Sequence, residues 1–124
     1  MFSRGEPSPL AQRVIETFIE SLSIAQAALS PGVPLSEVAE AIAGVLAPIA
    51  PRSYTPYGHG IGMDNFEPPP LSVDSDEVAE INMIVVTHPV LIVESRRFSL
   101  GDTYLVTETG AERLSQYPLE LVVV

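Results

Sequence analysis

The stretch that decides the fold is "LGDTYLVTETGAERLSQYPLEL", residues 100–121. Its segment "DTYLVTETG" at 102–110 contains β-branched residues and ends on glycine, which predicts a strand that enters a turn. "AERL" at 111–114 predicts a short return strand after that turn. The stretch therefore predicts a β-hairpin, and "ELVVV" at 120–124 predicts a final strand.

The segment before residue 50 has the apolar spacing of two helices. Ser8 is a predicted N-cap, because Pro9 follows it at the first helical position. A first helix over about 8–30 is predicted by apolar residues that recur in alternating steps of four and three, namely Ala11, Ile15, Phe18, Leu22, Ala25 and Leu29. A second helix over about 34–47 is predicted by a shorter apolar stripe and by the prolines that follow it, namely Val38, Ile42 and Val45, then Pro48 and Pro51.

The region 54–124 loses helical periodicity and is predicted to be rich in strands. Strands are expected at 81–87 and 89–93, interrupted between them at His88-Pro89. "INMIVV" shows little alternation, which favours strands covered on both faces. The acidic segment "PPPLSVDSDEVAE" (68–80) is predicted to be a solvated loop. The opening "MFSRGEP" is predicted to be irregular.

Composition limits the classes of protein to which this chain can belong. Its 124 residues, 46% of them apolar, predict one domain over 1–124 with a real core. The net charge is −10 and all six basic residues are arginine, which argues against nucleic acid or an anionic membrane as a partner. There is no cysteine, no membrane-length apolar run and no signal-peptide pattern, so a cytoplasmic location is expected.

Three segments together resemble the pita-bread family, which includes methionine and Xaa-Pro aminopeptidases, prolidase and creatinase. "GHGIGMDNFEPP" (58–69) resembles the family's histidine strand, and "NMIVVTHP" (82–89) resembles the strand that ends in a metal-binding glutamate before proline. The hairpin at 100–121 is the most specific match. The resemblance implies an α+β fold, with two helices packed on a mainly antiparallel curved sheet. "FSRGEPSP" (2–9) resembles the segment just after the family's metal-binding aspartates, so we expect the equivalent of the C-terminal half of the domain only.

The resemblance also places the family's metal ligands, which are two aspartates, one histidine and two glutamates. His59 matches the histidine, whereas His88 and Gly101 stand at the two glutamate positions and both aspartates lie outside the resemblance. Asp102 adjoins the vacant position but is expected on the other face of its strand. Two divalent ions need several carboxylates, so we expect the dinuclear site to be lost.

Two chemical roles remain for the histidines. In one, no cofactor is bound, and His59 acts as acid or base with Glu67 or His88 orienting it, as the likeness to creatinase implies. In the other, one divalent transition metal is held by His59 and His88, with Glu67, Asp64 or a partner's carboxylate as third ligand. A purely structural role is the alternative to both, in which His59 bonds to backbone in a glycine turn, although the flanking glycines are expected to expose it.

The remaining site residues follow from the same alignment. Phe66 replaces a histidine that contacts substrate in the family, and Tyr57, Asp64 and Phe66 are expected to line a substrate pocket. Tyr54 and Tyr57 are considered for this pocket because they precede the histidine strand, with packing as the alternative for both. Arg96 and Arg97 are expected on a solvated hairpin tip, with a clamp for a substrate carboxylate as the alternative.

A free half of the domain would expose apolar surface, so we expect association with a chain carrying the N-terminal half or with a second copy as a homodimer. Three functions fit these expectations. The first is a subunit of a repurposed enzyme acting on a small amide, amidine or carboxylic acid. The second is a metal-dependent Xaa-Pro peptidase-like hydrolase completed by a partner chain, and the third is a non-catalytic module that binds a peptide or protein.

Overall fold

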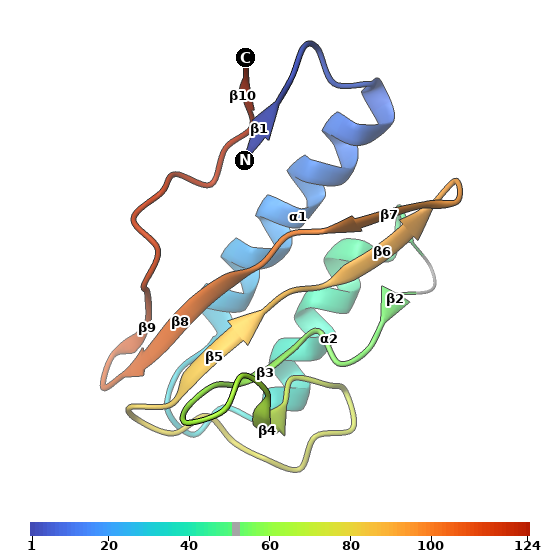
Figure 1. Cartoon of the computed structure of the whole chain (residues 1–124). Helices are drawn as coiled ribbons and strands as arrows, with labels where there is room; N and C mark the ends of the chain where they lie inside the picture. The colour runs from blue at the N-terminus through green and yellow to red at the C-terminus, as the bar shows by residue number, and fades with distance from the viewer. Residues whose placement is uncertain (51–52) are drawn as a thin grey trace.

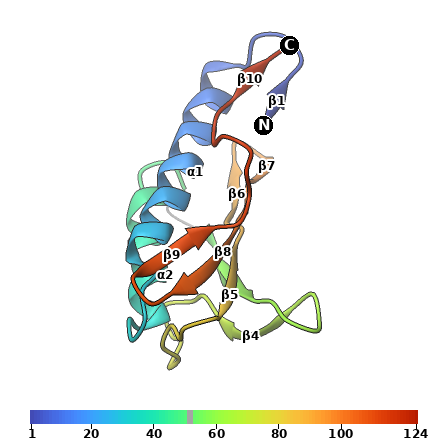
Figure 2. The ribbon, with the colours of Figure 1, turned by 90° about the vertical axis from the view of Figure 1, so that its left-hand side faces the viewer.

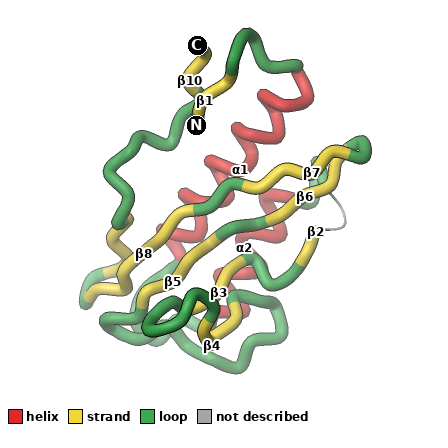
Figure 3. Tube along the Cα trace, viewed as in Figure 1, coloured by secondary structure: helices red, strands yellow, loops and turns green. Residues whose placement is uncertain are grey.

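The structure is a computed structural model that describes residues 1–50 and 53–124. Two helices come early in the chain and short strands follow them (Figures 1 and 3). The elements are β1 (Phe2–Ser3), α1 (Pro9–Ala28), α2 (Leu35–Leu46), β2 (Ser53–Tyr54), β3 (Gly58–Gly60), β4 (Glu67–Pro70), β5 (Ile84–Thr87), β6 (Val90–Val93), β7 (Arg96–Ser99), β8 (Asp102–Thr107), β9 (Gly110–Arg113) and β10 (Val122–Val123).

The strands form three sheets, and both helices cover one side of the two larger ones (Figures 1 and 2). One sheet has the order β4-β3-β5-β8-β9, and another has the order β2-β6-β7; all their pairings are antiparallel. β6 continues the line of β5, and β7 leads into β8, so the two sheets follow one another along one long ribbon (Figure 1). This arrangement confirms the predicted α+β class with a mainly antiparallel sheet.

Both predicted helices are present within a few residues of their expected ends. Ser8 caps α1, since its Oγ accepts a hydrogen bond from the Ala11 backbone N–H at 3.2 Å. The buried stripe of α1 is turned slightly from the prediction, because Val14 is fully buried whereas Ala11 and Ile15 are only half-buried. Val45 of α2 is likewise half-buried. Pro51, which was expected to help end the second helix, lies outside the described residues.

The ribbon formed by β5 and β6 has one covered face and one open face. Along residues 84–92 the odd-numbered residues are buried, and the even-numbered ones are half-buried or exposed. The prediction of strands covered on both faces is met on the helix side, and no element of the described residues packs over the other side. We call the side away from the helices the open face; it carries the even-numbered residues 84–92 and the residues paired with them.

Strand β5 is shorter than predicted, and one expected loop is partly structured. β5 begins at Ile84, because Asn82 adopts a positive φ of 71° in the turn that precedes it. The interruption at His88-Pro89 is confirmed. In the expected loop, residues 68–70 belong to β4, and Leu71 and Ala79 are buried, so the loop is only partly solvated.

The segment 1–7, expected to be irregular, contains a strand. β1 pairs in parallel with β10, and the partners are Phe2 with Val122 and Ser3 with Val123. The two ends of the described chain therefore lie side by side (Figure 1). Within residues 1–50 and 53–124, no helix is both long and apolar enough to cross a membrane.

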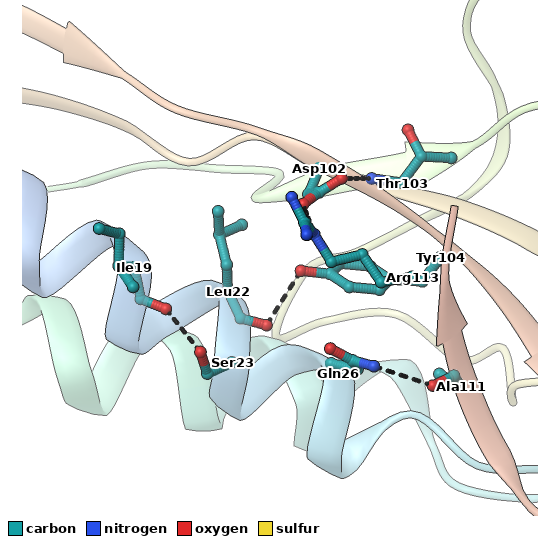
Figure 4. A network of polar contacts seen from close by, with 9 residues as sticks. All are labelled: Ile19, Leu22, Ser23, Gln26, Asp102, Thr103, Tyr104, Ala111 and Arg113. Atoms are coloured by element: carbon teal, nitrogen blue, oxygen red, sulfur yellow. Dashed lines mark hydrogen bonds and ion pairs between the residues drawn. The ribbon is translucent and has the colours of Figure 1, made fainter. Parts of the chain in front are cut away.

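Polar contacts fix α1 to the outer strands of the larger sheet (Figure 4). The hydroxyl of Tyr104 donates a hydrogen bond to the Leu22 carbonyl at 3.1 Å, and Gln26 Nε2 donates to the Ala111 carbonyl at 3.2 Å. Burial, with the nearby Asp102 charge as the second cause, raises the pKa of Tyr104 to about 12. The neutral phenol is therefore the form that the fold stabilises.

Replacing Tyr104 by Phe tests this anchor. At pH 7 the variant should lose about 1 kcal/mol of unfolding free energy, because the Leu22 carbonyl loses its donor. In the native chain stability should fall by about 2 kcal/mol as pH rises from 10 to 12, since the unfolded state releases the phenolic proton at lower pH than the folded state does. Urea denaturation at several pH values measures both effects, and a variant with the same alkaline loss as the native chain would contradict this account.

Candidate functional site

The histidine strand β3 lies between two neighbouring strands that approach it very closely. A Cβ added to Gly58 would overlap the Val86 carbonyl of β5, and one added to Gly60 would lie 2.5 Å from the Pro68 carbonyl oxygen of β4. Only glycine at these two positions permits such an approach. The expectation that the flanking glycines expose His59 is therefore wrong: they let the neighbouring backbones close around it, and its exposure is 7%.

His59 pairs in register with Val86, which places it on the open face. Its Nδ1 lies 2.8 Å from the carbonyl oxygen of Gly60. A carbonyl only accepts hydrogen bonds, so Nδ1 carries the proton and donates it there. In the neutral ring, Nε2 then keeps its lone pair and is the nitrogen able to accept a proton.

The His59 ring is held between two other rings. The centroid of Phe66 lies 4.3 Å away, with the planes inclined at 38°. The centroid of His88 lies 4.9 Å away, in an edge-on arrangement at 61°. The two imidazoles are therefore in contact on the open face. The packing of Phe66 on His59 was not foreseen, because nothing in residue spacing reveals that the 61–66 loop folds back.

Gly101 lies where the structure leaves no room for a side chain. A Cβ on Gly101 would lie 2.7 Å from the Thr87 carbonyl oxygen and 2.9 Å from His88 Cβ. A glutamate side chain at this position would force the backbones of β5 and β8 apart. Glycine at position 101 is therefore required by the packing of the sheet.

The other carboxylates predicted near the site are engaged elsewhere. Glu67 Oε1 accepts a hydrogen bond from the Asp64 backbone N–H at 2.6 Å, within the 61–66 loop. Asp102 is buried and forms an ion pair with Arg113 on the helix side, as its strand position predicted. Across residues 1–50 and 53–124, no three His, Asp or Glu side chains gather closely enough to hold a metal ion. Among these residues, neither Glu67 nor Asp64 completes a metal site with the two histidines.

The predicted pocket residues divide between the core and the surface. Tyr57 is 3% exposed, packs within the hydrophobic core and shares a hydrogen bond of 2.6 Å with Ser53 Oγ. Its burial agrees with packing, the alternative to a pocket-lining role for Tyr57. Phe66 is 60% exposed over His59, and Asp64 is exposed in the same loop.

The open face carries a hollow that includes Arg97, one of the two arginines for which a carboxylate clamp was the alternative to a solvated hairpin tip. It is lined by four residues of β2, β6 and β7, namely Tyr54, Val90, Ile92 and Arg97. Continued alternation beyond His88 was the signal that could have revealed it, because it brings residues 88, 90 and 92 to one face.

Comparison with known proteins gives consistent matches over most of the chain. The sequence profile of metallopeptidase family M24 matches residues 1–108. The uncharacterized peptidase YqhT of Bacillus subtilis is 30% identical over 125 residues, covering 96% of this chain and 35% of that protein. The chain therefore spans about a third of the length of such relatives.

Solved structures agree with the sequence match. Dipeptidase PepE from Mycobacterium ulcerans has a TM-score of 0.90 and 29% identity, over 99% of this chain and 34% of that one. The Xaa-Pro dipeptidase from Bacillus anthracis has a TM-score of 0.90 and 25% identity, over 99% of this chain and 36% of that one. The X-Pro aminopeptidase from Thermotoga maritima, at 23% identity and a TM-score of 0.89, shares the fold over 99% and 36% of the two chains. These matches confirm the predicted fold, half of a pita-bread domain.

Replacing Gly101 by Glu tests whether this position admits a side chain. We expect a loss of about 1–3 kcal/mol in unfolding free energy, because the new side chain overpacks the backbone of Thr87 and His88. Gly44→Glu is the matched control, since a Cβ at Gly44 meets nothing within 4 Å. Urea denaturation measures both variants. A Gly101→Glu chain that is as stable as the control and takes up zinc or manganese would contradict the packing argument.

Proposed function

The chain belongs to metallopeptidase family M24, and from that premise we propose that it is part of a repurposed pita-bread enzyme that works without the family's metal pair. In this proposal the histidines perform acid–base or hydrolytic chemistry on a small amide, amidine or carboxylic acid. The observation that carries it is the contact between His59 and His88 on the open face, at 4.9 Å between ring centroids.

The geometry of His59 suits proton transfer. Because Nδ1–H is held by the Gly60 carbonyl, Nε2 is the nitrogen that removes a proton from water or substrate. The imidazolium formed then keeps its hydrogen bond to that same carbonyl, which stabilises the positive charge. His88 is the adjacent group able to return a proton to a leaving nitrogen. Low exposure and the Phe66 ring keep His59 in one orientation.

The proposal includes completion of the site by further polypeptide. The open face carries exposed apolar side chains such as Ile92, at 46% exposure, with no element among the described residues packed over them. A chain carrying the N-terminal half of the domain, or a second copy of this one, would cover that face and close a cavity over the histidines.

A metal-dependent hydrolase is the second candidate, and one observation favours it. The two imidazoles are adjacent, and a carboxylate from a partner chain would supply the third donor that the described residues lack. In this version turnover requires the metal, whereas in the first version it does not.

Replacing His59 by Asn separates the candidates. We expect turnover to fall about 100-fold or more, as for loss of a general base, with the circular dichroism spectrum unchanged. Release of amine from Xaa-Pro dipeptides, simple amides and guanidino acids is the assay, run on the chain with its partner bound. Glu20→Gln on the exposed side of α1 is the control and should retain full activity.

Chelation gives the second arm of this experiment. Turnover that survives EDTA and depends on His59 supports the metal-free enzyme, whereas turnover that EDTA abolishes supports the metal-dependent hydrolase. If the chain shows no turnover and the His59→Asn variant binds its partner as tightly as the native chain, the chain is a non-catalytic binding module. Both enzyme proposals would then be wrong.

A further inference from the structure

A pocket of about 390 Å³ lies on the open face and is lined by Tyr54, Val90, Ile92 and Arg97. The pairing register explains why these four side chains meet. Tyr54 is paired with Val90, and Ile92 is paired with Arg97, so directly opposed residues on three strands point to one side of the sheet. The pocket is therefore built on strands, which hold its walls more firmly than a loop would.

The pocket lies next to the histidine pair along the β5–β6 ribbon. His88, Val90 and Ile92 are alternate residues of the β5–β6 ribbon and lie on the same face. Alternate residues on a strand are about 7 Å apart, so the near wall at Val90 is one such step from His88. A ligand in the pocket would extend toward the histidines with no strand between them.

The lining defines the chemical class of ligand. Three of the four side chains offer aromatic or aliphatic surface, and the fourth is a guanidinium. Among the described residues, no carboxylate lines the pocket. The ion pair found in that part of the chain joins Arg113 to Asp102 and does not involve Arg97. The positive charge of Arg97 is therefore available to an anion, and a guanidinium matches a carboxylate in bidentate geometry.

The net charge of the whole chain limits the class of ligand further. With a net charge of −10, the surface repels anions, and a ligand with several negative charges is repelled most. One arginine offsets one negative charge. We infer that this pocket binds a monocarboxylic acid with an apolar body, in which Arg97 holds the carboxylate and Tyr54, Val90 and Ile92 hold the apolar part. Its use in turnover rests on the proposed function, whereas the binding itself does not.

Titration with 3-phenylpropanoate tests the inference, using chemical-shift changes of the valine and isoleucine methyl groups. We expect saturable shifts at Val90 and Ile92, and binding of the uncharged 3-phenylpropanamide at least about tenfold weaker, since a charge-assisted hydrogen bond is lost. Arg97→Gln should weaken binding of the acid by a similar factor and leave binding of the amide unchanged.

Arg96→Gln is the matched control. Arg96 is the adjacent residue of β7, equally exposed, and its side chain points to the opposite side of the strand. Binding by this variant should equal that of the native chain. Ile92→Ala, which keeps the charge and shortens one apolar wall, should weaken acid and amide alike.

Several outcomes would overturn the inference. Absence of binding by the native chain, equal affinity for acid and amide, or equal losses in the two arginine variants would each do so. His59→Asn distinguishes this inference from the proposed function, because that variant should still bind the acid. If no turnover is found but the acid binds through Arg97, the proposed function is wrong and the binding site stands.

Discussion

The geometry of the site depends on one constraint, the close approach of backbone to backbone at three glycines. Gly58 and Gly60 let β5 and β4 close on either side of the histidine strand, and Gly101 lets β8 pass beside His88. Any side chain at these positions would push the strands apart by more than a packed sheet tolerates. The same constraint that buries His59 and fixes its contact with His88 also leaves no space for a side chain at position 101.

That constraint separates what the sequence could reveal from what it could not. Helices, the hairpin and the break at His88-Pro89 are local features, set by spacing, caps and turn residues, and they were predicted within a few residues. The burial of His59 was predicted wrongly, because a glycine that exposes a neighbour and one that admits a neighbouring strand look identical in sequence. The core position of Tyr57 and the packing of Phe66 likewise depend on contacts between different segments of the chain, which the local sequence pattern does not reveal.

The chemistry proposed for the open face follows from the side chains that lie on it. The pita-bread framework brings His59 and His88 together, while the carboxylates that remain are tied to the loop backbone or to Arg113. Imidazoles without neighbouring carboxylates suit proton transfer better than they suit a pair of divalent ions. The apolar pocket that contains Arg97 lies next to His88 on the same face and would allow such a site to orient a small acid.

Native mass spectrometry of the purified protein, together with whatever chain copurifies and in the presence of added manganese, tests the central claim most directly. The account predicts an assembly, either with a second copy or with a larger partner, whose mass shows no pair of bound metal ions. An assembly that carries two metal ions for each copy of this chain would contradict it, because the described residues offer no donor set for them.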